Sequence, residues 1–265
     1  MNNHHLHSIH HVRDFEFFKL EQLSGKIDIM ISHDWPAGIT SYGNVGNLLR
    51  FKPHFQNDIQ NNCLGSPPSF SFLKSKKPTY WFSAHLHCFF PAIYNHPPQN
   101  EKDEIQKTKF LGIDKVIPGR RFLQVIELEM DEKLDKDLRY DLEWLAITKN
   151  THHLISFSGE EYSFQKILQQ NQKSFVPSES ELNQINLLLK DSTIIPQNFV
   201  KTLPSYLEVL SENIYEPYNL NPQTKALLET LQISSPTPAM VSNIFPQLNH
   251  PSSENHNPEE INLDF

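Results

Sequence analysis

The sequence is poor in cysteine and in positive charge, and each shortage excludes classes of protein. Its 265 residues include two cysteines, Cys63 and Cys88, and neither belongs to a C-x-x-C pair. Two such cysteines cannot form a disulfide framework, which predicts a reducing compartment such as the nucleus or the cytosol. The formal net charge of −8 argues against a broad basic surface for nucleic acid.

Long apolar runs are also missing. No run approaches the ~20 residues that a membrane helix needs, and the start MNNHHLHSIHH has no hydrophobic core of a signal peptide. We therefore expect neither a membrane protein nor an exported one. Nineteen prolines against eight glycines predict that much of the chain is extended or loosely ordered.

Basic residues are nevertheless bunched in two stretches of this acidic chain. Two interpretations remain open from the sequence, a small positive patch that touches RNA locally and an ordinary solvated face. The bunched residues are Lys74, Lys76 and Lys77, followed by Lys107, Lys109, Lys115, Arg120 and Arg121.

Hydrophobic spacing predicts an amphipathic helix over residues 12–23 and buried strands over residues 27–31 and 79–82. The stretch 37–78 looks mostly irregular, because it contains four glycines and a Ser66-Pro67-Pro68 break. Residues 122–128 alternate well enough to predict a strand with one face toward water.

Beyond residue 140 the patterns become helical. Apolar residues from Leu142 to Leu154 predict one helix, and the capping-box pattern Ser178-x-x-Glu181 predicts the start of another. Residues 232–265 are rich in proline, serine and acidic side chains, which predicts a disordered tail.

The fourteen histidines fall into groups of different value. Five lie near the start of the chain with no carboxylate or cysteine among them, which favours terminal low complexity over a metal site. They are His4, His5, His7, His10 and His11.

His33, His85 and His87 are different, because they follow directly after predicted strands. In an extended segment the pattern H-x-H places both rings on the same face, where they can serve one metal ion or two adjacent ions. Satisfied structural histidines remain the alternative, with Asp34 as a helix cap or turn residue.

Several blocks of the sequence resemble the eukaryotic RNA lariat debranching enzymes in order and spacing. They are HVRDFEFFKL, ISHDWP, LGSPP, YWFSAHLH, TKFLGIDKVIPGRRFLQVIEL, YDLEWLAITKNTHHL and NPQT, within roughly residues 8–230. The resemblance implies a calcineurin-like metallophosphoesterase, an α/β fold with a β-sandwich flanked by helices and a two-metal site at strand ends. It implies hydrolysis of the 2'-5' phosphodiester at the branch point of excised intron lariat RNA, in the nucleus with shuttling to the cytoplasm left open.

The resemblance also implies site residues and cofactors. His33 and His85 would serve one divalent ion of iron, zinc or manganese, and His87 would serve the second. The glycine usual before the first histidine of the closing G-H-x-H motif is replaced by Ala84.

The upstream motifs of the family, C-x-H or D-x-H, then G-D and G-N-H-E, are not found before Ile31. The resemblance therefore implies the second half of a catalytic domain at residues 1–108 and the family's C-terminal domain at 109–231, followed by the tail. It places the general acid outside the chain, and neutral imidazoles alone are not expected to hold both ions. We thus expect doubtful activity for these residues alone, with a non-catalytic fragment contacting splicing or RNA-turnover proteins as the alternative.

Overall fold

The computed structural model describes residues 14–98, 100, 104–128, 137–155, 175–198, 200 and 221–235. The chain divides into two compact units, Met1–His153 with Ser163–Ile195 and Leu154–Tyr162 with Pro196–Phe265. The predicted tail from residue 236 onward and the five N-terminal histidines lie outside the described residues. No helix in the described ranges is long and apolar enough to cross a membrane.

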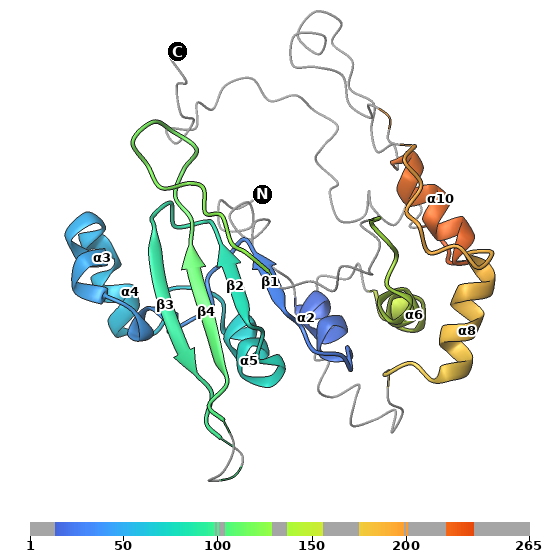
Figure 1. Cartoon of the computed structure of the whole chain (residues 1–265), viewed down its shortest axis with the longest axis horizontal. Coiled ribbons are helices and arrows are strands. Elements are labelled where there is room, and N and C mark those ends of the chain that lie inside the picture. The colour runs from blue at the N-terminus through green and yellow to red at the C-terminus, as the bar shows by residue number, and fades with distance from the viewer. Residues whose placement is uncertain are drawn as a thin grey trace, which may run out of the picture. The chain divides into compact units, whose positions relative to one another are not determined.

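The first unit is an α/β structure with one mixed four-stranded sheet (Figure 1). The spatial order of the strands is β1-β2-β4-β3; β1, β2 and β4 run parallel, and β3 is antiparallel to β4. Their bounds are β1 Ile29–Ser32, β2 Tyr80–Ser83, β3 Phe90–Asn95 and β4 Lys107–Gly112. The strands predicted over residues 27–31 and 79–82 are therefore confirmed. The predicted domain boundary at 108/109 falls within β4, which lies between β2 and β3 in the sheet.

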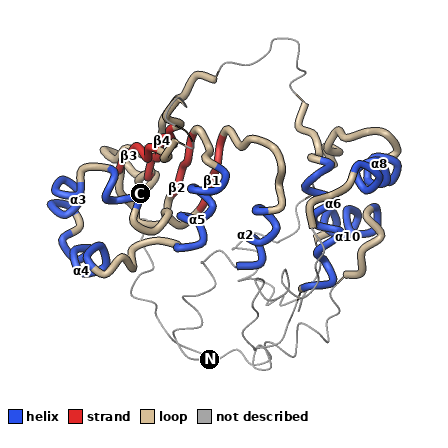
Figure 2. The backbone as a smooth tube through the Cα atoms, turned by 90° about the horizontal axis from the view of Figure 1, so that it is seen from below, coloured by secondary structure: helices blue, strands red, loops and turns tan. Residues whose placement is uncertain are grey.

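Helices cover one face of this sheet. In β3 buried and exposed residues alternate strictly, because successive side chains of a strand point to opposite faces. On the covered face Phe72 of α5 packs edge-to-face against both Trp81 of β2 and Phe17 of α2. Figure 2 shows α2 (Asp14–Glu21) and α5 (Pro67–Lys76) on the same side of the strands. The predicted helix over residues 12–23 is confirmed where it is described.

The prediction that residues 37–78 are irregular is wrong. Besides α5, the stretch forms η2 Ile39–Tyr42, α3 Val45–Phe51, η3 Pro53–Phe55 and α4 Gln56–Gln60. Ser66-Pro67 marks the start of a helix rather than a break, since Ser66 accepts a hydrogen bond from the Ser69 amide and Pro67 occupies the first helical position.

The predicted strand over residues 122–128 is also wrong. These residues pair with no described strand, and the side chains of Leu123 and Val125 are 76% and 77% exposed. Alternation of apolar and polar residues gives a segment one face that can be buried, but it does not specify a neighbouring strand. A strand needs such a neighbour, because its backbone N–H and C=O groups form hydrogen bonds with it.

The predicted helices of the second half are confirmed where they are described. In the first unit α6 is Leu142–Thr151 and α8 is Glu179–Leu188, and η4 (His152–Leu154) follows α6 in the chain. The capping box of α8 is present, with the Ser178 amide donating to Glu181 Oε2 at 2.8 Å. The second unit contains α10 Pro222–Thr230.

His96, the residue after β3, is a buried histidine that contacts β4. It is 2% exposed, and its Nε2 lies 2.8 Å from the Thr108 hydroxyl, which donates to the Pro78 carbonyl. Thr108 must therefore accept, so Nε2 of His96 carries the proton. Burial, then the charge of Lys77, lowers the pKa of His96 below 6.5.

We expect the free energy of unfolding to fall as the pH drops below about 6.5, because the unfolded chain then binds a proton that folded His96 excludes. The loss continues down to the lowered pKa of the folded state. Urea titrations between pH 7.5 and 5 measure it, and His96→Gln should reduce the slope. Because the pKa of His87 is also lowered, His87→Gln serves as the comparison. An unchanged slope in His96→Gln would contradict this assignment.

Candidate metal centre

The candidate site lies where two parallel strands end side by side. Ser32 and Ser83 are the last residues of β1 and β2 and are paired across the sheet, although they are 51 residues apart in sequence. The Ala84 amide donates to the His33 carbonyl at 3.1 Å, which continues the alignment one step beyond the strands. The register therefore places His33 and the loop carrying His85 at the same sheet edge.

A hydrogen-bond network fixes the two strand ends. The hydroxyls of Ser32 and Ser83 lie 2.9 Å apart and donate to the Asp34 carbonyl oxygen at 2.7 and 3.1 Å. The Trp81 indole N–H approaches the same hydroxyls at 2.9 and 3.1 Å. These buried polar contacts hold the backbone of Asp34 in place beneath the histidines.

Trp35 ties the histidine loop to the core. It is 1% exposed, stacks on Phe90 with ring centroids 5.2 Å apart, and donates from its indole nitrogen to the Ala84 carbonyl at 2.9 Å. Trp35 is therefore a core residue and not a surface for stacking on a base.

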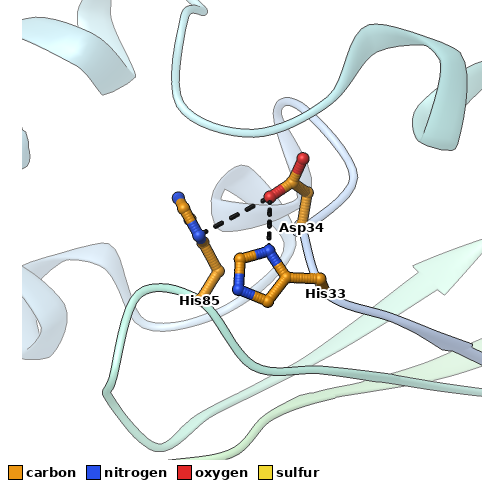
Figure 3. Close-up of side chains that lie close together, drawn as sticks. All are labelled: His33, Asp34 and His85. Atoms are coloured by element: carbon orange, nitrogen blue, oxygen red, sulfur yellow. Dashed lines mark hydrogen bonds and ion pairs between the residues drawn. The ribbon is translucent and has the colours of Figure 1, made fainter. Parts of the chain in front are cut away.

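Three side chains gather at this edge, two imidazoles and one carboxylate (Figure 3). One ligand atom from each of His33, Asp34 and His85 lies within 4.8 Å of the others. Asp34 Oδ1 is 3.1 Å from Nδ1 of His33 and 3.6 Å from Nδ1 of His85. The carboxylate is buried, with 4% of its side chain exposed, whereas the histidine side chains are 46% and 36% exposed.

The orientation of the rings indicates how they would bind an ion. Both Nδ1 atoms face Asp34, so the Nε2 atoms are turned away from the carboxylate (Figure 3). Histidine ligands of metals commonly donate from one ring nitrogen to a carboxylate and bind with the other. Two imidazoles oriented by a carboxylate are a donor set that suits zinc, iron or manganese.

His87 lies outside this group of three. The expectation that H-x-H is extended is wrong, because His85 and His87 have φ values of +56° and +50°, in the left-handed region. The shared-face argument for their rings therefore does not apply. Burial first, then the charges of Lys115, Lys52 and His85, lower the pKa of His87, so its imidazole is neutral at pH 7.

Cys88 follows His87 and lies outside the group of three candidate ligands. The side chain is buried, and desolvation raises the pKa of its thiol to about 11. The thiol is therefore protonated near neutral pH and unreactive as a nucleophile.

Asp34 is the residue that sequence reasoning assigned to a cap or turn. The available signal was its position beside His33 at the end of a strand, where polar residues often carry function. Its part in the group depends on His85, which the sequence alone does not place nearby.

Comparison with known proteins gives a consistent picture. A family model described as the C-terminal domain of lariat debranching enzyme matches residues 105–236. The chain is 38% identical to the lariat debranching enzyme of Gallus gallus over 221 residues, which is 83% of the chain and 41% of that protein. It is 37% identical to that of Homo sapiens over 230 residues (86% and 42%) and 36% identical to that of Arabidopsis thaliana over 267 residues (98% and 60%). The chain thus spans about half the length of the relatives that it matches.

Proposed function

Because the chain is a homologue of the lariat debranching enzymes, we propose that it takes part in hydrolysis of the 2'-5' phosphodiester bond at the branch point of lariat RNA. The observation that carries the proposal is the meeting of His33, Asp34 and His85 at the ends of β1 and β2. Catalytic groups of metallophosphoesterases lie at such strand ends. Excised introns as the source of the substrate favour a nuclear location.

In this proposal His33 and His85 would hold one divalent ion, and Asp34 would position both rings. A bound ion would polarise the phosphodiester and lower the pKa of a bound water. The chain's own residues align the imidazoles, because the buried carboxylate accepts a hydrogen bond from Nδ1 of His33 and faces Nδ1 of His85.

His87 serves a second ion in this proposal, as in the paired-metal site of the family. Its neutral imidazole suits this role, and its main-chain carbonyl accepts a hydrogen bond from Arg120 at 3.3 Å. Paired-ion hydrolysis needs an anionic bridge between the ions. The described part of the chain offers one group of three candidate ligands. In this proposal the bridging ligand comes from the part of a full-length enzyme that this chain does not span.

A chimera tests the proposed function. We expect the Gallus gallus enzyme, with its aligned segment replaced by this chain, to cleave a branched RNA at the 2'-5' bond. His85→Ala should lower the rate about 100-fold or more by removing a ligand of the ion. His54→Ala, which changes an exposed histidine of η3, is the matched control. Cleavage that His85→Ala leaves unchanged would contradict the proposal.

A further inference from the structure

A cavity of about 650 Å³ lies beside the histidine loop. One wall is formed by α3 and Lys52, another by the segment from Cys88 to Pro91, and a third by residues 114 and 119–121. The volume falls within the range of roughly 300–1,000 Å³ that is typical of ligand sites. Arg120 and Arg121 of its lining belong to the second basic stretch of the sequence.

The lining of the cavity is positively charged, although the whole chain is acidic. Lys52, Arg120 and Arg121 contribute three cations, and Asp114 contributes one carboxylate. Asp114 Oδ2 is paired with Arg120 Nε at 2.9 Å. Lys52 and Arg121 thus supply a surplus of positive charge that attracts an anionic ligand.

Aromatic surface accompanies these cations. Phe51, at the end of α3, lines the cavity and is 74% exposed. The Arg121 guanidinium lies over the Phe89 ring, 4.9 Å from its centroid. Exposed aromatic rings beside Lys and Arg are typical of sites for single-stranded nucleic acid, where bases stack and cations follow the phosphates.

The cavity is connected to the candidate metal centre through the chain itself. Cys88 and Phe89 directly follow the loop that carries His85 and His87. Arg120, in the cavity wall, donates to the His87 carbonyl. A single-stranded nucleic acid held in the cavity would therefore continue toward the histidines.

We propose that this cavity binds a single-stranded segment of the RNA substrate, with a base on Phe51 and phosphates on Lys52 and Arg121. The proposal rests on the proposed function for the nature of the ligand. An acidic peptide would use the cations but would leave the aromatic face of Phe51 without a planar group to stack on, so the aromatic surface favours RNA.

Fluorescence anisotropy of a labelled eight-nucleotide single-stranded RNA tests the proposal with the 265-residue chain in EDTA, which removes metal from the measurement. We expect Phe51→Leu to weaken binding by about 5- to 100-fold because the base no longer stacks on an aromatic ring. In the Lys52→Gln/Arg121→Gln double variant, the slope of log K against log salt concentration should decrease by about 1.4, or about 0.7 for each phosphate that a cation no longer neutralises.

Two variants on or beside α8, which contributes nothing to the cavity wall, are matched controls. Leu187→Ala removes an exposed apolar side chain and Lys190→Gln an exposed cation, and both should bind RNA as the native chain does. An unchanged affinity in Phe51→Leu, an unchanged salt slope in the double variant, or a glutamate peptide that binds as tightly as RNA would overturn the proposal.

Failure of the cavity and failure of the metal centre give different results. RNA binding that responds to Phe51 and Lys52, in a chain that binds no divalent ion, would support the cavity and refute the proposed function alone. Metal binding without any response of RNA affinity to these residues would do the reverse.

Discussion

The Asp34→Asn variant is expected to bind Zn²⁺ about 10- to 100-fold more weakly than the native chain, the usual effect of removing a carboxylate that orients histidine ligands. Asparagine keeps the size of the side chain and one oxygen acceptor, but it removes the negative charge. The carboxylate faces Nδ1 of both His33 and His85, so both rings lose their orienting partner. The buried position of Asp34 keeps water from replacing it.

Isothermal titration with Zn²⁺ measures this prediction, with one strongly bound ion expected for each native chain. Asp114→Asn is the matched control, because Asp114 is also largely buried but pairs with Arg120 outside the metal group. Thermal melts of both variants separate loss of metal binding from loss of folding. Equal affinities for the native chain and Asp34→Asn would show that the carboxylate does not position the rings.

Gly112→Ala is expected to reduce the free energy of unfolding by about 3 kcal/mol, at the upper end of typical overpacking costs. A Cβ at Gly112 would lie 2.8 Å from Trp35 Cε2, closer than carbon atoms approach in proteins. Gly112 is the last residue of β4 and pairs with Ser83 on one side and Phe90 on the other, so the backbone cannot retreat. Trp35 must move instead, which weakens the hydrogen bond from its indole nitrogen to the Ala84 carbonyl.

Urea denaturation measures this loss, and Gly25→Ala is the control because an added Cβ there has no atom within 4 Å. A smaller side chain at residue 35 should relieve the clash. The double variant Gly112→Ala/Trp35→Phe is therefore expected to be more stable than the sum of its single effects predicts. Strict additivity would show that Trp35 is not the residue that Gly112 accommodates.

The elements predicted correctly from sequence have signals contained within a short stretch. The capping box at Ser178 and Glu181 begins α8 through hydrogen bonds between residues three apart. The prediction at Pro67 was wrong because proline lacks a backbone N–H. That property excludes it from the interior of a helix but suits it to the first helical position, and the local sequence did not distinguish the two. Residues 122–128 failed for a different reason, since their alternation does not specify a pairing strand.

The candidate site was predicted in part. His33 and His85 were singled out because each follows a strand, and the structure brings these two together. Their assignment as metal ligands remains a prediction, as does that of His87. Asp34 was not assigned to the metal site, because a carboxylate next to a strand end can have many roles. Its position beside both imidazole rings, which the structure shows, distinguishes it.

The sequence by itself determined β1, β2, α2, α6 and the start of α8, and that histidines follow two of the strands. The tertiary structure decided which side chains lie beside those histidines. Parallel pairing of β1 with β2 in one register sets Ser32 beside Ser83, and thereby His33 and Asp34 beside His85. The same long-range packing brings Phe51 and Arg121 to the lining of one cavity. Local propensity acts over a few residues, whereas these meetings depend on strand order and core packing across the whole unit.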